Sequence, residues 1–128
     1  MNRVTLQHIL EQKQQGRKIV MLTAYDTPFA RILDDCGVDI ILVGDSVANV
    51  VLGLKSTRDV DVEAMLHHAG AVCRGVSRAL VVADLPYRTC RKPAEGVVAD
   101  ARRFLDAAGC GAVKIEWFNG CLPVVHAL

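Results

Sequence analysis

Three carboxylates follow three successive apolar segments of this 128-residue sequence. They are Asp45, Asp84 and Glu116, and Lys114 lies two residues before the last of them. Carboxylate oxygens suit hard cations such as Mg²⁺, whereas zinc prefers nitrogen and sulfur ligands. Without a cation, three neighbouring carboxylates repel one another. The sequence therefore predicts a Mg²⁺ site at Asp45, Asp84 and Glu116, with the longer Glu116 placed to act through a bound water.

Each carboxylate taken alone also has a structural explanation, because an acidic residue just after a strand often caps the next helix. That explanation accounts less well for three carboxylates at equivalent places in successive units. Lys114 shares strand parity with Glu116, so both side chains are expected to face the same interior. A lysine inside an apolar segment is costly unless it meets an anion.

Two kinds of segment alternate along the chain and indicate the fold. Short β-branched segments are expected to be buried parallel strands, and apolar residues at helical spacing between them are expected to be helices packed on the sheet. Such repetition predicts a parallel α/β sheet with right-handed crossovers. The expected strands are 18–23, 38–43, 79–83 and 111–115, and the expected helices are roughly 5–15, 27–36, 62–73, 93–108 and the start of one at 121–128.

Capping residues support these boundaries. Asp26 is the expected N-cap of a helix, Pro93 is expected to open another, and Gly37 and Gly109 stand where helix ends need a left-handed residue. The connection 46–61 is unusually long for a compact domain. It is either a loop that closes over a ligand or a plain surface excursion.

Length and composition limit the class of protein. A complete eight-stranded βα barrel needs roughly 250 residues, so this sequence is too short for one. The chain is 52% hydrophobic with a net charge of +1, which excludes disorder and gives no basic surface for nucleic acid or an anionic membrane. Its most apolar stretch, 36–54, is interrupted by Asp39 and Asp45, so no transmembrane helix is predicted.

The expected compartment is the cytoplasm. The first ten residues lack the apolar run of a secretory signal. Five cysteines without C-x-x-C spacing favour reduced, mostly buried thiols over disulfides or zinc.

Other candidate sites are weaker. His67 and His68 lie on a helix beside apolar residues, which favours a structural role. No histidine is placed beside a cysteine or serine in a way that specifies nucleophilic catalysis. There is no Walker loop and no G-x-G-x-x-G after a strand, so nucleotide sites have no support.

The ordered motifs resemble the ketopantoate hydroxymethyltransferase family, specifically its N-terminal half. The resemblance covers about residues 5–116 and is specific because the motifs occur together and in order. The matching segments are 23–26 (TAYD), 43–46 (VGDS), 52–53 (LG), 56–57 (ST), His68 with 71–72 (AV) and 74–75 (RG), 83–86 (ADLP) and 112–116 (AVKIE).

The resemblance implies a TIM (β/α)8 barrel and a Mg²⁺-dependent enzyme of pantothenate biosynthesis. That enzyme transfers a hydroxymethyl group from 5,10-methylenetetrahydrofolate to 3-methyl-2-oxobutanoate, giving 2-dehydropantoate, and it assembles as a homo-oligomer. By motif, Asp45, Asp84 and Glu116 resemble the metal-site residues. Ser46 and Lys114 resemble the contacts to the oxo acid, which also meets Asp45 and Asp84.

The resemblance further implies that 1–128 is a single partial domain of about four βα units. The family's general base, a glutamate of the second half, is then expected beyond residue 128, and no catalytic residue is expected in this chain. Two segments depart from the family pattern: 117–120 (WFNG) replaces a small glycine-rich segment, and 47–49 (VAN) replaces Leu-Gly-Met. Two alternatives stay open: a truncated non-catalytic half-barrel that binds a divalent metal or assembles with another chain, and a related oxo-acid lyase.

Overall fold

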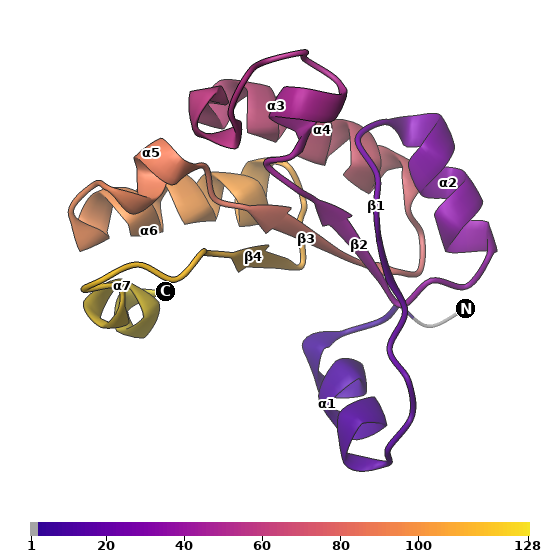
Figure 1. The fold of residues 1–128 in the computed structure, drawn as a ribbon. Coiled ribbons are helices and arrows are strands. Elements are labelled where there is room, and N and C mark those ends of the chain that lie inside the picture. Colours follow the sequence, from indigo (N-terminus) through magenta and orange to yellow (C-terminus); the bar gives the residue numbers. More distant parts are fainter. Residues whose placement is uncertain (1–2) are drawn as a thin grey trace.

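A computed structural model describes residues 3–128 and shows one sheet of four parallel strands in the order β1-β2-β3-β4 (Figure 1). The strands are β1 (Met21–Thr23), β2 (Ile40–Val43), β3 (Leu80–Asp84) and β4 (Ala112–Lys114). Neighbouring strands in the sheet are also consecutive in the chain, and each pair is joined by helical segments. The predicted parallel α/β architecture is confirmed.

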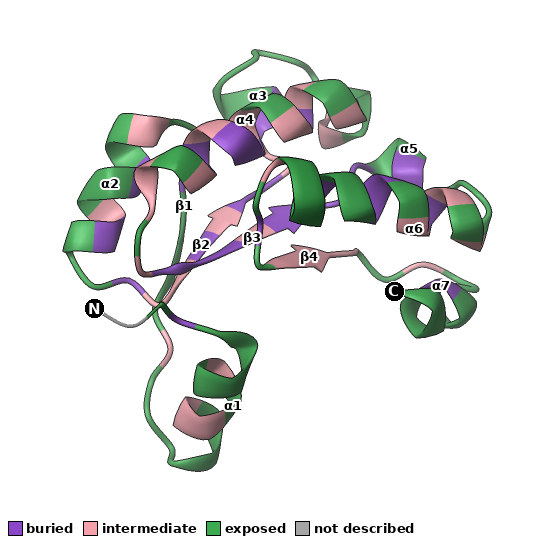
Figure 2. Cartoon of the chain, turned by 180° about the vertical axis from the view of Figure 1, so that it is seen from behind, coloured by how far each residue is buried: buried purple, intermediate pink, exposed green. Residues whose placement is uncertain are grey.

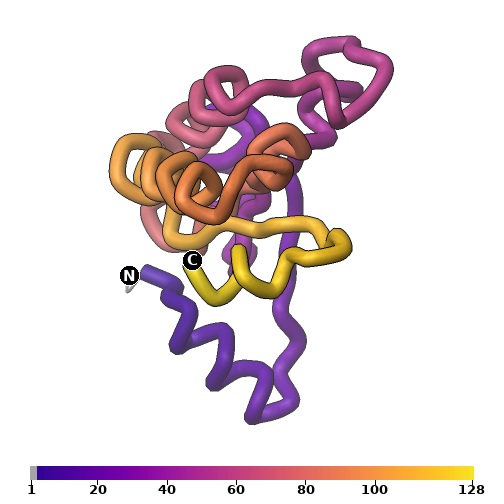
Figure 3. Tube along the Cα trace, turned by 90° about the vertical axis from the view of Figure 1, so that its left-hand side faces the viewer, coloured from indigo at the N-terminus to yellow at the C-terminus, as the bar shows by residue number. Residues whose placement is uncertain are grey.

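Helices cover one face of the sheet. Helices α2 (Thr27–Asp35), α4 (Val62–Gly75) and α6 (Ala94–Arg102) lie along that face (Figure 2), whereas α1 (Leu6–Gln14) lies apart from them (Figure 3). The last helix, α7 (Leu122–Ala127), begins with Pro123 in its first turn. Within residues 3–128, no helix has the length and apolar character needed to cross a membrane.

The core forms between α4 and the central strands. In β2, Ile41 and Val43 are fully buried while Ile40 and Leu42 are only half-buried, as expected if alternate residues face the helices and the opposite face is left uncovered. From α4, Met65 and Val72 belong to the same buried cluster. Asp61 caps α4 by accepting a hydrogen bond from Ala64 N–H at 2.8 Å.

The carboxylate of Asp34 ties the end of α2 to the start of β3. It accepts hydrogen bonds from the backbone N–H groups of Ser77 (2.8 Å), Arg78 (3.0 Å) and Ala79 (2.6 Å), and from the Ser77 hydroxyl (2.9 Å). These donors precede β3, so the carboxylate satisfies backbone groups that no neighbouring strand reaches. Burial raises the pKa of Asp34, but the hydrogen bonds outweigh burial and lower it overall.

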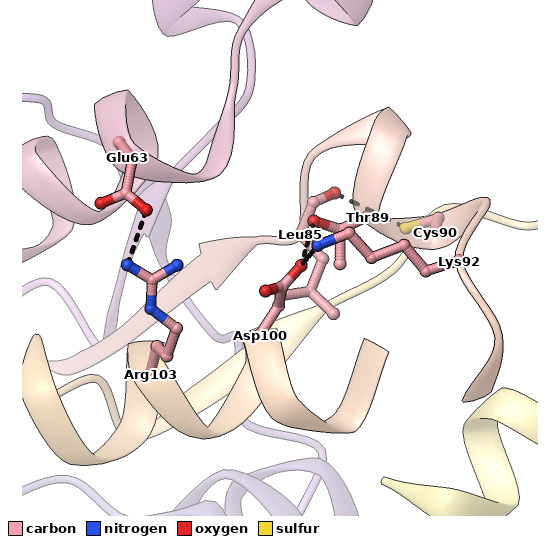
Figure 4. Close-up of polar contacts among 7 residues, drawn as sticks. All are labelled: Glu63, Leu85, Thr89, Cys90, Lys92, Asp100 and Arg103. Atoms are coloured by element: carbon pink, nitrogen blue, oxygen red, sulfur yellow. Dashed lines mark hydrogen bonds and ion pairs between the residues drawn. The ribbon is translucent and has the colours of Figure 1, made fainter. Parts of the chain in front are cut away.

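Two polar ties hold α6 in place (Figure 4). Asp100 accepts hydrogen bonds from the Thr89 hydroxyl (2.9 Å) and the Lys92 ammonium (2.6 Å), which joins α6 to the short helix α5 (Tyr87–Cys90). Arg103, the residue directly after α6, pairs with Glu63 of α4 at 2.7 Å. The segment that follows β3 is therefore anchored to the helical layer.

Three expectations from the sequence need correction. The first strand is shorter than 18–23, and β1 is exposed rather than buried, because it is an edge strand with no neighbour on one side within residues 3–128. The connection 46–61 is not a structureless loop, since it contains α3 (Val47–Val50) and the 3₁₀ helix η1 (Thr57–Asp59). The helix expected at 93–108 ends at Arg102 and continues as a π-helical turn, η2 (Arg103–Ala107).

Other boundaries follow the capping signals. Asp26 caps α2 by accepting from Phe29 N–H at 2.8 Å, and α6 starts directly after Pro93. Gly37 and Gly109 have φ angles of 82° and 83°, the left-handed conformation expected where helices end. Three of the five cysteines are buried, whereas Cys36 is exposed.

Candidate functional site

The sheet register brings Asp84 and Lys114 together. They are the last residues of β3 and β4 and pair directly across the two strands. The Lys114 ammonium lies 2.8 Å from Asp84 Oδ1 and 3.1 Å from Glu116 Oε1. Asp84 is only 5% exposed, so this ion pair partly neutralises a buried carboxylate.

Asp45 joins the same group from β2. Its backbone N–H donates to Asp84 Oδ2 at 3.1 Å. Burial, followed by the negative charges of Asp84 and Glu116, raises the pKa of Asp45, and Lys114 and Thr57 offset part of that rise. The four sequence-selected charged residues therefore form one electrostatic cluster at the carboxyl ends of the strands.

The cluster holds Lys114 in its charged form. Burial alone lowers the pKa of Lys114, but its contacts with Asp84 and Glu116, and their charges, raise it overall. The lysine is thus charged at neutral pH and lies against the carboxylates selected as metal ligands.

The donor set suits a hard cation. Asp84 Oδ1 is buried and accepts no hydrogen bond of good geometry from residues 3–128, although the Lys114 ammonium lies beside it. A buried carboxylate oxygen in this condition has capacity for a further cation. Within the described residues, however, no three His, Cys, Asp or Glu side chains are already spaced around one point as metal ligands. The chemistry of the residues fits Mg²⁺, while their present spacing is that of a lysine-bridged cluster.

Ser46 lies at the end of a short polar chain. Its hydroxyl oxygen is 2.6 Å from the phenol oxygen of Tyr25, and His68 Nδ1 is 2.8 Å from the Tyr25 carbonyl oxygen. A Cβ on Gly44 would lie 2.9 Å from Ser46 Oγ, so any larger residue there would displace the serine hydroxyl from this position. The structural role expected for a histidine of this helix agrees with the contact that His68 makes.

A pocket of about 320 Å³ opens beside the cluster. Asp45 and Glu116 line it, as do Trp117 and Phe118 from the segment 117–120 that departs from the family pattern. Three further lining residues, Arg58, Tyr87 and Arg91, were not singled out from the sequence. Arg58 and Tyr87 lie on short helices within segments that carry no helical periodicity, so the sequence pattern did not place them near the site.

Sequence comparison relates nearly the whole chain to one family. The family model for ketopantoate hydroxymethyltransferase matches residues 3–128. A 3-methyl-2-oxobutanoate hydroxymethyltransferase from Acetivibrio thermocellus is 51% identical over 127 residues, covering 99% of this chain and 45% of that protein. One from Caldicellulosiruptor saccharolyticus is 49% identical over 128 residues, covering 100% of this chain and 47% of that protein. The chain spans about half the length of these curated relatives.

Solved structures show the same arrangement of strands and helices. A phosphoenolpyruvate phosphomutase from Streptomyces platensis subsp. rosaceus superposes with a TM-score of 0.66 at 27% identity, over 83% of this chain and 36% of that one. A phosphonopyruvate hydrolase solved with oxalate and Mg²⁺ superposes with a TM-score of 0.68 at 19% identity, over 85% of this chain and 38% of that one. The fold is the N-terminal half of a TIM barrel, as predicted. On the match across residues 3–128, the chain belongs to the ketopantoate hydroxymethyltransferase family.

Proposed function

We propose that residues 1–128 form a single partial domain that supplies the metal- and oxo-acid-binding half of a 3-methyl-2-oxobutanoate hydroxymethyltransferase. The reaction transfers a hydroxymethyl group from 5,10-methylenetetrahydrofolate to 3-methyl-2-oxobutanoate and gives 2-dehydropantoate. One observation carries the proposal: Asp45, Asp84, Lys114 and Glu116 gather at the strand ends beside a pocket. The relatives' name supplies the substrate.

Asp45 and Asp84 are the proposed direct ligands of Mg²⁺, and Glu116 acts through a bound water. When bound, the ion supplies Lewis-acid polarisation of the substrate's keto oxygen. Asp84 suits its role because its buried Oδ1 lacks a well-oriented hydrogen bond. Burial, followed by the negative charges of Asp84 and Glu116, raises the pKa of Asp45, and a cation relieves the charge repulsion.

Lys114 and Ser46 are the proposed contacts to the oxo acid. The Lys114 ammonium offsets negative charge on the carboxylate and on the keto oxygen as the C3 proton leaves. The Ser46 hydroxyl, oriented by Tyr25, donates a hydrogen bond to the substrate. The group that removes the C3 proton is proposed to be a glutamate outside residues 1–128. The full-length protein is proposed to act as a cytoplasmic homo-oligomer.

A calorimetric titration of the chain with Mg²⁺ and 3-methyl-2-oxobutanoate tests the proposed binding half. We expect Asp84→Asn to abolish the heat of binding, and the exposed Glu95→Gln to leave it unchanged as a matched control. Unchanged binding by Asp84→Asn contradicts the proposed cluster. Formation of 2-dehydropantoate by the 128-residue chain alone contradicts the placement of the proton-removing group outside it.

The second candidate is a non-catalytic half-barrel that assembles with another chain. The exposed edge strand β1 favours it, because its outer side has no partner strand within residues 3–128. Adding Mg²⁺, the oxo acid and the folate co-substrate to the chain together with the remaining half of a relative separates the two candidates. Product formation supports the enzyme half, whereas assembly without product supports the non-catalytic form.

A further inference from the structure

The pocket beside the carboxylate cluster is lined by groups of opposite charge. Asp45 and Glu116 contribute carboxylates. Arg58, on η1, and Arg91, directly after α5, contribute guanidinium groups. A ligand that fills this pocket therefore meets both acidic groups and guanidinium groups.

The two arginines share one aromatic ring. The guanidinium carbon of Arg58 lies 4.7 Å from the centre of the Tyr87 ring, and that of Arg91 lies 5.6 Å from it. Both distances are within the range of cation–π attraction. The Tyr87 ring thus attracts both guanidinium groups. It keeps these two like charges close together although they repel one another and come from separate elements.

Neither guanidinium is neutralised by a carboxylate within the described part of the chain. The ion pairs found there involve Lys92, Arg103 and Lys114, and none involves Arg58 or Arg91. Two preorganised guanidinium groups without a carboxylate partner form a site for a planar anion, because each can donate two parallel hydrogen bonds to a carboxylate.

Aromatic surface lies in the same pocket. Phe118 lines it, and Trp117 does so while remaining 75% exposed, so a flat ring can pack against the tryptophan. The volume of about 320 Å³ is at the low end for pockets that take drug-sized ligands. Lys114 and Ser46, the proposed contacts to the oxo acid, are not among its lining residues, so the pocket offers space beside the oxo acid.

We propose that Arg58 and Arg91 form a carboxylate-binding subsite for the glutamate tail of the reduced-folate co-substrate, with its p-aminobenzoyl ring against Trp117. This inference rests on the proposed function, because that function supplies a co-substrate with an aromatic segment and a carboxylate tail. The reactive end of the folate is then left to meet the carboxylate cluster, whose Asp45 and Glu116 line the same pocket. The arginines are specificity-determining residues, and their role is to select ligands that carry the tail.

The single tryptophan of the chain allows a direct test, since Trp117 lies in the pocket and its fluorescence reports binding there. The probes are p-aminobenzoyl-triglutamate and p-aminobenzoate, which share the ring and differ in the tail. We expect the triglutamate to bind far more tightly. Arg58→Gln and Arg91→Gln each weaken it about tenfold, the double variant weakens it further, and p-aminobenzoate binding is unchanged.

Arg88→Gln is the matched control, because Arg88 is an exposed arginine on α5 outside the pocket lining. An equal loss of affinity in Arg88→Gln, or full affinity in the Arg58→Gln/Arg91→Gln variant, overturns the proposal. Displacement of the triglutamate by inorganic phosphate at equal concentration also overturns it, because the site is then a general anion site. Circular dichroism of each variant verifies that it is folded.

The Asp84→Asn variant separates this inference from the proposed function. We expect it to lose Mg²⁺ and oxo-acid binding while retaining the full affinity for p-aminobenzoyl-triglutamate. If the chain binds Mg²⁺ but its affinity for the triglutamate does not depend on the arginines, the result contradicts only the tail subsite. If the parent chain does not bind Mg²⁺, the result contradicts only the proposed function.

Discussion

The phenol oxygen of Tyr25 lies 2.6 Å from the hydroxyl oxygen of Ser46. Tyr25 follows β1 and Ser46 follows β2, so the contact joins two neighbouring strand ends. His68 holds the backbone of Tyr25 from α4. The orientation of the proposed substrate-binding serine is therefore set by the first strand and by the helical layer.

Tyr25→Phe should weaken binding of the oxo acid in the presence of Mg²⁺ several-fold, because Ser46 loses the partner that fixes its hydroxyl. The cost in folding stability should be only about 1 kcal/mol, the typical value of one hydrogen bond. Calorimetry of Tyr25→Phe, Ser46→Ala and the double variant measures the coupling. Additive losses in the double variant contradict a joint action of the two hydroxyls.

Lys114→Gln should bind Mg²⁺ alone more tightly than the parent chain and bind the oxo acid more weakly. The lysine occupies the field of Asp84 and Glu116, so its removal leaves more negative charge for the cation and less positive charge for the substrate. The expected gain in Mg²⁺ affinity is about tenfold, equivalent to about 1.4 kcal/mol. Lys55→Gln, at an exposed lysine, is the control, and weaker Mg²⁺ binding by Lys114→Gln contradicts the prediction.

Asp45→Asn should stabilise the fold at neutral pH by about 0.5–1 kcal/mol while removing a proposed ligand. The folded-state pKa of Asp45 is raised, so the folded state binds more protons than the unfolded state between the two pKa values. The parent chain therefore loses stability as pH rises through that window. Urea denaturation at about pH 7 and about pH 3 checks this, since the advantage of the variant should disappear below the unfolded pKa of about 3.9.

Asp34→Asn should destabilise the protein by about 2–3 kcal/mol at neutral pH, because buried backbone donors lose a charged acceptor. The folded-state pKa of Asp34 is lowered, so its contribution is present above the unfolded pKa of about 3.9 and is lost as pH falls through the folded value. Asp35→Asn, at the exposed neighbour, is the control. A constant difference between parent and Asp34→Asn down to about pH 2 contradicts this account.

The chain studied on its own should self-associate through β1. Met21 and Leu22 on this strand, and Val20 just before it, are between 41% and 48% exposed, and the outer side of β1 has no partner strand within residues 3–128. Light scattering over a concentration series should show a rising mass, which Leu22→Lys reduces. Ile32→Lys, at an exposed apolar residue of α2, should leave it unchanged; a monodisperse monomer contradicts the prediction.

Most of the fold follows from local pattern. The strands β2 and β3 and the helix α4 are marked by apolar periodicity and by caps such as Asp61, and these signals are contained within each segment. The exposure of β1 is not marked by any signal within its own segment. It depends on how many strands neighbour β1, a property of the assembled sheet that the residues of 18–23 do not carry.

The residues of the candidate site also fall into those that local sequence pattern could place and those that it could not. Asp84 and Lys114 could be placed together because both stand at strand ends, and the parallel register aligns those ends. Arg58 and Tyr87 could not, because they meet through η1 and α5, which are too short to show periodicity. Their proximity is a product of tertiary packing.

The simple strand order has a consequence for how the protein is made. Within residues 3–128, each strand after β1 pairs with the one that precedes it in the chain, so none of these strands must wait for a distant segment before it finds a partner. The sheet can therefore grow one unit at a time as the polypeptide leaves the ribosome. The ends of β3 and β4 come last in that order, so the Asp84–Lys114 pair forms only once the preceding strands are in place.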